Sequence, residues 1–326
     1  MSDAIQAEGL VKRFGETTAL AGADLEARTG SVLAVLGPNG AGKTTAVRIL
    51  ATLLQPDAGR ATVAGYDVVA QAHQVRQLIA LTGQYAAVDE SLTGTENLVL
   101  IGRLLGLSRA GSRRRAATLL EEFALADAAG RATKTYSGGM RRRLDLAASM
   151  VGRPRVLYLD EPTTGLDPRG RGDLWRVVRG LVGEGVTVLL TTQYMDEADQ
   201  LADDVVVIDR GRVVATGTPD QLKTQVGGQV LHVSPVREAD MATVVRVVTD
   251  LAGAAPDAVN GGVSARVGDP LLPPAVLRHL TDAGVPVAEL SLRRPSLDEA
   301  FFALTGHRTD GGDGAGGPDD DDRSAA

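Results

Sequence analysis

Nine consecutive residues decide the fold of this chain, and they read Gly37-Pro38-Asn39-Gly40-Ala41-Gly42-Lys43-Thr44-Thr45. Their spacing is that of the phosphate-binding pattern G-x-x-x-x-G-K-[ST]. The stretch follows an apolar run at residues 32–36 and opens a helical pattern over residues 44–54. A strand, a glycine-rich turn and a helix in this order place backbone N–H groups around an anion, at the positive end of the helix dipole.

We therefore predict that all nine residues form an ATP site. The alternative, a glycine-rich turn with an incidental lysine, leaves the strand before it and the helix after it unexplained. Lys43 can reach the β- and γ-phosphates as a point charge. The hydroxyl of Thr44 is placed to bind Mg²⁺, a hard cation that takes oxygen ligands. ATP and Mg²⁺ are the expected cofactors.

A second apolar run, at residues 156–159, ends in two acids, Asp160 and Glu161. Acids at the carboxyl end of a buried parallel strand lie where such sheets bind ligands. Asp160 can hold Mg²⁺ directly or through water, and Glu161 can accept a proton from the water that attacks the γ-phosphate. The alternative is a solvated strand end, which the phosphate-binding loop upstream disfavours.

Composition excludes several other classes of protein. The chain has 326 residues and no cysteine, so disulfides and thiolate metal sites are ruled out. Its four histidines show no metal-ligand spacing. We see no apolar run of about 18 residues, no secretory signal and no basic stripe interleaved with aromatic residues. We expect no nucleic acid partner, and a cytosolic chain unless another protein holds it at a membrane.

The chain alternates between strand and helix patterns. Apolar runs at residues 32–36, 156–159 and 186–190 predict buried parallel strands, with helices at 44–54, 112–123 and 174–181 between them. Residues 5–10 and 18–27 predict antiparallel strands, and residues 205–208 with 213–216 a hairpin. Strands and helices in this order predict a parallel sheet covered on both faces.

We predict three parts, listed here in chain order: a nucleotide-binding domain at 1–223, a small α+β domain at 224–306 and a disordered acidic tail at 307–326. In the second part, strand patterns lie at 229–233, 263–267 and 286–292, and helical patterns at 239–251, 271–281 and 297–304. The apolar residues of the last helix are expected in the core of the small domain or on a dimer surface; binding of a partner is the alternative.

A third motif gives the family resemblance: Tyr136-Ser137-Gly138-Gly139-Met140, then Arg141-Arg142-Arg143-Leu144, the Asp160-Glu161 strand and Gly165-Leu166-Asp167-Pro168. This order resembles the ATP-binding subunits of ABC transporters over about residues 4–223. The fold class it implies is α/β: a P-loop NTPase core with a mostly parallel sheet, an antiparallel β subdomain and a helical subdomain, plus a small C-terminal α+β domain.

The same resemblance implies a homodimer of nucleotide-binding domains arranged head to tail. Ser137, Gly138 and Gly139 would cap the γ-phosphate of the ATP held by the partner's Lys43, and Asp167 would lie at the dimer seam. A hydroxyl, two close backbone N–H groups and a helix N-terminus suit that task.

Three further residues receive roles by resemblance. Gln84 matches a glutamine that senses Mg²⁺ and contacts the membrane partner, and Phe14 matches an aromatic residue that stacks on adenine. A packed turn residue is the alternative for Phe14. Gln193 stands where most members carry a histidine that contacts the γ-phosphate; its amide can donate a hydrogen bond but cannot become cationic.

Two segments, residues 191–199 and 296–306, resemble the daunorubicin/doxorubicin-resistance group of these subunits. That implies an ATPase that powers export of a drug-like or hydrophobic compound through a separately encoded membrane-spanning permease. The chain would then lie at the cytoplasmic face of the cell membrane, held by the permease. A non-transport ABC ATPase and a weakly hydrolytic nucleotide-dependent regulator are the alternatives.

Overall fold

The computed structural model describes residues 3–83, 88–225, 228–259, 261–269 and 271–306. Gln84 and the predicted acidic tail at 307–326 lie outside the described residues. Within the described part of the chain, none of the helices has the length and hydropathy that crossing a bilayer requires.

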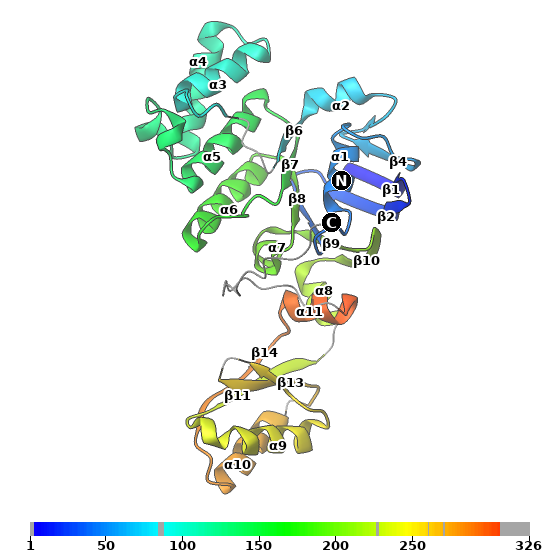
Figure 1. Cartoon of the computed structure of the whole chain (residues 1–326), viewed down its shortest axis with the longest axis vertical. Coiled ribbons are helices and arrows are strands. Elements are labelled where there is room, and N and C mark those ends of the chain that lie inside the picture. Colours follow the sequence, from blue (N-terminus) through cyan, green and yellow to red (C-terminus); the bar gives the residue numbers. More distant parts are fainter. Residues whose placement is uncertain (1–2, 84–87, 226–227, 260, 270, 307–326) are drawn as a thin grey trace, which may run out of the picture.

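The centre of the larger unit is a six-stranded sheet in the order β10-β9-β3-β8-β7-β6 (Figure 1). Its strands are β3 (Val32–Leu36), β6 (Ile79–Thr82), β7 (Val156–Asp160), β8 (Thr187–Thr192), β9 (Asp204–Asp209) and β10 (Arg212–Gly217). Every pair is parallel except β9 with β10, which form the predicted hairpin. The three predicted parallel strands are therefore confirmed, and they lie side by side as β3, β8 and β7.

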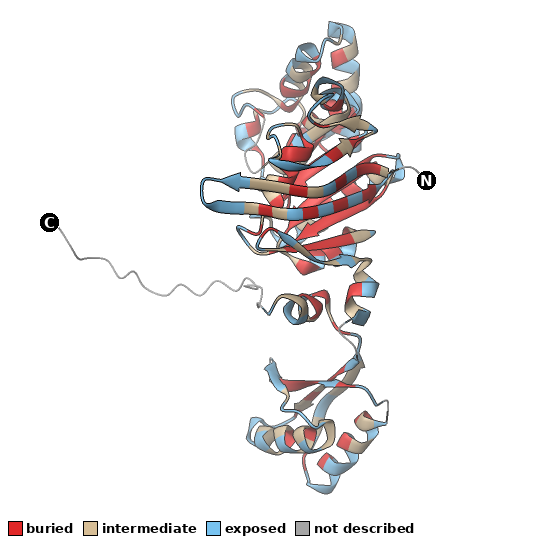
Figure 2. Ribbon diagram, turned by 90° about the vertical axis from the view of Figure 1, so that its right-hand side faces the viewer, coloured by how far each residue is buried: buried red, intermediate tan, exposed pale blue. Residues whose placement is uncertain are grey.

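Alternate residues of these strands enter two separate hydrophobic cores. Leu33 and Val35 of β3 face one core, whereas Ala34 and Leu36 face the other. The first core contains α1 (Lys43–Leu50) and an antiparallel sheet. The second contains α5 (Gly138–Ser149), α6 (Pro168–Gly183) and α7 (Met195–Leu201), together with buried residues of further helices described below. Because both faces are covered, the strands are continuously apolar, and Figure 2 shows them as the most buried part of the unit.

The antiparallel sheet has the order β2-β1-β4-β5. Its strands are β1 (Asp3–Phe14), β2 (Thr17–Arg28), β4 (Ala58–Val63) and β5 (Tyr66–Asp67), and the short helix α2 (Ala72–Leu78) follows them. The pairing of β1 with β2 confirms the predicted antiparallel strands. The phosphate-binding loop thus lies between two sheets.

A helical part lies on the other side of the central sheet. It comprises α3 (Gly94–Leu104), α4 (Arg109–Glu122) and α5, with single turns η1 (Ala126–Ala128), η2 (Thr133–Thr135) and η3 (Met150–Gly152). The predicted helix at 112–123 begins three residues earlier because the Ser108 hydroxyl accepts a hydrogen bond from the Gly111 N–H. Helix α3 was not predicted, although Thr93 and Glu96 form a capping box at its start.

The small unit is a four-stranded antiparallel sheet, in the order β12-β13-β11-β14, with two helices on one face. Its elements are β11 (Gln229–Pro235), η4 (Glu238–Asp240), α9 (Met241–Ala252), β12 (Asp257–Val259), β13 (Gly262–Val267), α10 (Leu272–Asp282) and β14 (Val287–Arg293). The βαββαβ order is that of a ferredoxin-like sandwich. Each predicted strand and helix of residues 229–292 is present; β12 is additional.

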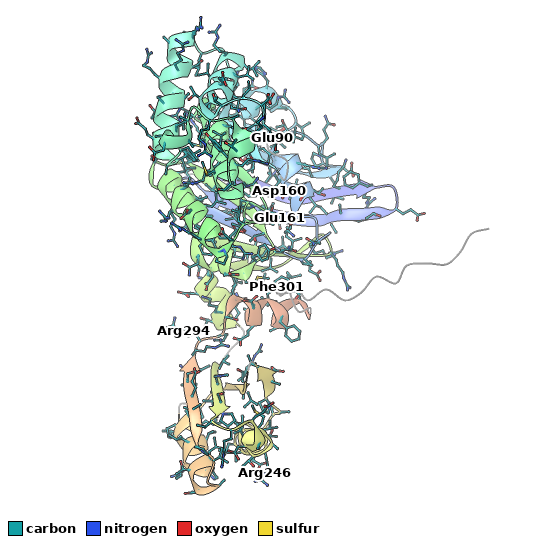
Figure 3. All side chains as sticks on the ribbon, turned by 60° about the vertical axis from the view of Figure 1, so that its left-hand side comes forward. Glu90, Asp160, Glu161, Arg246, Arg294 and Phe301 are labelled. Atoms are coloured by element: carbon teal, nitrogen blue, oxygen red, sulfur yellow. The ribbon has the colours of Figure 1, made fainter. Side chains whose placement is uncertain are left out.

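The last helix, α11 (Leu297–Thr305), departs from the prediction. It packs against α8 (Pro219–Gln225), α7 and β10 rather than on the small sheet. Leu297, Ala300 and Phe301 are buried in the same core as Leu222 of α8. Figure 3 labels Phe301 where α11 meets the larger unit. The expectation of a small-domain core or a dimer surface is wrong for these residues, because helical spacing reveals a buried face but not the unit that buries it.

Candidate functional site

The candidate site lies where the central strands end. The loop of residues 37–45 follows β3, Glu161 follows β7, and Gln193 follows β8. These strands are parallel neighbours, so their carboxyl ends meet at one edge of the sheet. Figure 3 labels Asp160 and Glu161 there, next to the antiparallel strands. The fold brings the loop and the two acids together, and Thr44 and Asp160, which are in contact, lie 116 residues apart in sequence.

Two glycines of the loop leave no room for a side chain unless neighbouring backbone moves. Gly42 has a φ of 110°, and a Cβ added there would lie 2.4 Å from the carbonyl oxygen of Ala19. A Cβ on Gly37 would lie 2.2 Å from the carbonyl oxygen of Ile208. The loop is also tied to the hairpin, since the Gly211 N–H donates to the Ala41 carbonyl at 2.9 Å. Neighbouring backbone therefore fixes the loop's curvature.

Lys43 is buried within this loop, with only 5 % of its side chain exposed. Its Nζ donates to the carbonyl oxygens of Gly37 at 2.7 Å and Pro38 at 3.1 Å. The same Nζ lies 3.6 Å from Oε1 of Glu161. Burial lowers the pKa of Lys43, and the negative charge of Glu161 opposes that shift. The ammonium group is thus held between the loop and the acid.

Asp160, Thr44 and Thr191 form a hydroxyl–carboxylate cluster. The Thr44 hydroxyl donates to both carboxylate oxygens of Asp160, at 3.1 Å each, and the Thr191 hydroxyl donates to Oδ1 at 2.5 Å. A carboxylate and a hydroxyl are the hard oxygen ligands that Mg²⁺ prefers. Among the described residues, no group of three or more His, Cys, Asp or Glu side chains is placed to hold a metal ion by itself. This donor set therefore fits a Mg²⁺ that takes its remaining ligands from phosphate and water.

Glu161 is held in an uncommon backbone conformation. Its φ is 49°, in the left-handed region that non-glycine residues seldom adopt. Its N–H donates to the carbonyl and the hydroxyl oxygens of Thr191, both at 3.1 Å. Its side chain is 13 % exposed, so water can reach it. Strain of this kind persists where the surrounding structure fixes it, and it gathers at functional sites.

The predicted signature residues lie on the surface. Ser137 caps α5, and its hydroxyl accepts a hydrogen bond from the Met140 N–H at 3.2 Å. Gly138 and Gly139 have no neighbouring heavy atom within 4 Å of an added Cβ. Asp167 caps α6 and accepts from the Gly170 N–H at 2.9 Å. In the part of the chain that the structure describes, no hydrogen bond of Ser137 or Asp167 reaches the phosphate-binding loop.

Two other predicted site residues lie at the margins. Phe14 ends β1 and is 50 % exposed, with the Lys12 ammonium 5.8 Å from its ring centre. Half of the residue's surface is therefore open to solvent, and its role as a stacking residue stays a prediction. Gln193 is half-buried directly after β8, and the guanidinium of Arg171 lies 4.7 Å from the ring centre of the adjacent Tyr194.

Two residues with structural roles at the site were missed. Thr191 contacts both Asp160 and Glu161, but a threonine inside an apolar strand gave no signal beyond its place before Gln193. Arg142 donates to the carbonyl of Pro162, next to Glu161. It stands in a run of three arginines, and the sequence does not show which of the three contacts the site.

A phosphate-binding loop, a buried lysine and two acids at the edge of a parallel sheet define a P-loop nucleotide hydrolase. Residues 20–164 match the ABC transporter family, and residues 217–305 match the C-terminal domain of DrrA1-3-like ATP-binding proteins. The chain belongs to the ABC transporter family, with relatives that are daunorubicin-resistance ATP-binding proteins, and it is an ATPase of that family.

The similarity extends over nearly the whole chain. It is 56% identical to the daunorubicin resistance ATP-binding protein DrrA2 of Streptomyces coeruleorubidus, over 94% of this chain and 96% of that protein. It is 52% identical to the daunorubicin/doxorubicin resistance ATP-binding protein DrrA of Streptomyces peucetius, over 94% of each chain. A solved ATP-binding cassette of an ABC transporter in its ADP conformation superposes with a TM-score of 0.62 at 26% identity, covering 68% of this chain and 93% of that one. The predicted family and fold class are thus confirmed.

Proposed function

We propose that this chain hydrolyses ATP to power export of a drug-like, hydrophobic compound through a separate membrane-spanning permease. The observation that carries the proposal is the Lys43–Glu161 pair beside the Thr44–Asp160 cluster, in a chain 56% identical to a daunorubicin resistance protein. ATP-binding subunits of resistance transporters work with such permeases. The chain would therefore lie at the cytoplasmic face of the membrane, held by its permease.

Each side chain has a separate task in hydrolysis. Lys43 exchanges its backbone carbonyl partners for phosphate oxygens, which are stronger acceptors because they are charged. Glu161 accepts a proton from the attacking water. Thr44 and Asp160, with Gln84, would hold Mg²⁺, which when bound neutralises charge on the phosphates. The side-chain amide of Gln193 donates to the γ-phosphate, and the ring of Phe14 stacks on adenine.

A complete site needs two copies of the chain. The exposure of Ser137, Gly138 and Asp167 supports this proposal, since their free surfaces suit a partner's nucleotide and seam. The test is to mix two inactive variants, Lys43→Ala and Ser137→Arg. A mixed dimer then contains one intact site, so random mixing in a two-fold arrangement restores at most roughly a quarter of the parent rate, and less where the two sites are coupled. No recovery, with mixed dimers demonstrated by tag capture, would contradict the composite site.

We expect a membrane-spanning permease to be encoded beside this chain, and the transport proposal is tested with that protein. The two are co-purified and reconstituted, and phosphate release is measured with daunorubicin and with a polar control compound. We expect stimulation by the hydrophobic compound and its ATP-dependent movement across vesicles. A complex that hydrolyses ATP without moving any compound would favour a non-transport ATPase, and one that binds but does not hydrolyse ATP would favour a regulator.

A further inference from the structure

One arginine of the signature helix reaches the catalytic turn. Arg142 lies in the second turn of α5, and only 15 % of its side chain is exposed. Its Nε donates to the carbonyl of Pro162 at 2.9 Å, and its Nη1 donates to the carbonyl of Gly83 at 2.9 Å. Nη1 also lies 3.5 Å from Oδ2 of Asp145 on the same helix. A single guanidinium therefore joins α5, the residue after β6 and the turn after β7.

These contacts complete the restraint on Glu161. On one side of that residue, its own N–H is bound by Thr191. On the other side, the carbonyl of Glu161 accepts a hydrogen bond from the Thr164 N–H at 3.3 Å, and the carbonyl of the next residue, Pro162, accepts one from Arg142. A left-handed residue between two fixed peptides has little freedom to move its carboxylate. Arg142 thus helps to set where Glu161 points without touching the reacting atoms.

The planar fork of arginine suits this position better than any other cation. Two donors at a fixed angle bind two backbone carbonyls at once, which a lysine ammonium on a flexible stem does less well. Burial lowers the pKa of Arg142, and the charge of Asp145 opposes that shift. The Arg142 guanidinium thus lies beside the catalytic turn although its burial removes water from a charged group, which is unfavourable.

The neighbouring arginines do not share these contacts. Arg141 pairs with Glu90, an exposed residue of the helical side, at 2.8 Å (Figure 3 labels Glu90). Arg143 donates to the carbonyls of Phe123 and Ala124 at the end of α4, both at 3.3 Å. Among the described contacts of the three arginines, those of Arg142 alone reach the turn that carries Glu161.

We propose that Arg142 is a positioning residue that couples the signature end of α5 to Glu161 of the same chain. Ser137 caps the helix five residues before Arg142, which is about 7.5 Å along a rigid helix. Contact of Ser137 with the partner's nucleotide, which rests on the composite site proposed above, would then shift or hold Pro162 and so Glu161. Each site would sense the nucleotide bound at the other.

The test uses the full chain in complex with its permease. Arg142→Lys keeps the charge, Arg142→Met removes it, and Arg141→Met is the matched control one residue away. Phosphate release is measured across ATP concentrations to give kcat, the half-saturating concentration and the Hill coefficient, and ATP binding is measured on the same proteins. We expect both Arg142 variants to lower kcat by about tenfold or more and to bring the Hill coefficient toward 1, while ATP affinity changes by less than about twofold.

The control is expected to retain the parent's kcat and Hill coefficient. If Arg142→Met does not fold, Arg142→Lys carries the test. Unchanged kcat and Hill coefficient in Arg142→Lys, or a loss of ATP affinity in proportion to kcat, would overturn the proposal. Failure of the composite site is detected separately, because the mixture of Lys43→Ala and Ser137→Arg would then show no recovery in chains with Arg142 intact.

Discussion

The two halves of the candidate ATP site differ in how their residues are held. Lys43 and Asp160 are buried, and each is bound by several groups of the same chain. Ser137 and Asp167 are exposed, and their side chains accept hydrogen bonds only from the helices they cap, as far as the described residues show. The first half is organised before nucleotide binds. The second has the properties of a surface that another molecule completes.

Glu161→Gln should produce the largest effect, because it removes the proposed base from the buried half. The amide keeps the shape of the side chain but can neither accept the proton nor pair with the ammonium of Lys43. Phosphate release should fall by on the order of a hundredfold or more. ATP binding, measured in parallel, should persist. Glu184→Gln, at an exposed carboxylate, is the control, and equal losses in both variants would remove Glu161 from the mechanism.

A pair of glycine variants compares the two halves directly. Gly42→Ala places a Cβ 2.4 Å from the Ala19 carbonyl at a φ of 110°. It should lower the free energy of unfolding by about 1–3 kcal/mol and weaken ATP binding. Gly138→Ala has no neighbour within 4 Å, so it should unfold like the parent yet hydrolyse ATP more slowly, because the methyl group would meet the partner's nucleotide. Denaturant unfolding and phosphate release separate these outcomes. A destabilised Gly138→Ala chain would contradict the difference between the halves.

Gln193 should have an intermediate effect. Its amide donates to the γ-phosphate in our proposal, so Gln193→Ala should lower kcat by roughly tenfold, the usual cost of losing a hydrogen bond to a charged group. Gln193→His restores a donor and should retain more activity than Gln193→Ala. Steady-state phosphate release decides between them. Equal rates for Gln193→Ala and the parent would exclude the contact.

Glu197, behind the site, should give the smallest effect and one that depends on pH. Burial raises the pKa of Glu197 to about 7, although the Thr163 hydroxyl donates to it. Because the pKa in the folded chain lies above that of the unfolded chain, the carboxyl group stabilises the fold while protonated, and this stability is lost as the pH rises through about 7. Glu197→Gln mimics the protonated form. Its melting temperature relative to the parent should therefore increase by a few degrees between pH 5 and 8, on the order expected for a shift of this size.

Thermal unfolding at several pH values measures this difference. Glu16→Gln, in the exposed turn between β1 and β2, is the control and should follow the parent at every pH. Parallel curves for Glu197→Gln and the parent would mean that the carboxyl group does not titrate in this range.

The sequence predicted the parts of the fold that local patterns determine. Continuous apolar runs placed β3, β7 and β8, and the spacing of Gly37, Gly42 and Lys43 placed the loop, because strand burial and phosphate binding both impose fixed spacings. Thr191 and Arg142 could not be found this way. Their contacts join segments 20 or more residues apart, and several end on backbone carbonyls, which carry no sequence signal. Local patterns also could not predict where Phe301 packs, because its helix could be buried in the core of the small unit or in that of the larger unit, and the structure shows the latter.

The return of α11 has a mechanical consequence. The chain leaves the larger unit after α8 and comes back to it at α11, so the ferredoxin-like unit is attached by two connections rather than one. A unit joined by one connecting segment can rotate in all directions. A unit joined by two adjacent connecting segments, or tethers, rotates chiefly about the line between them. Both tethers end in helices that pack on β10, and α11 also packs on α7, which begins two residues after Gln193. Torque on the small unit would therefore be delivered to these elements of the ATPase.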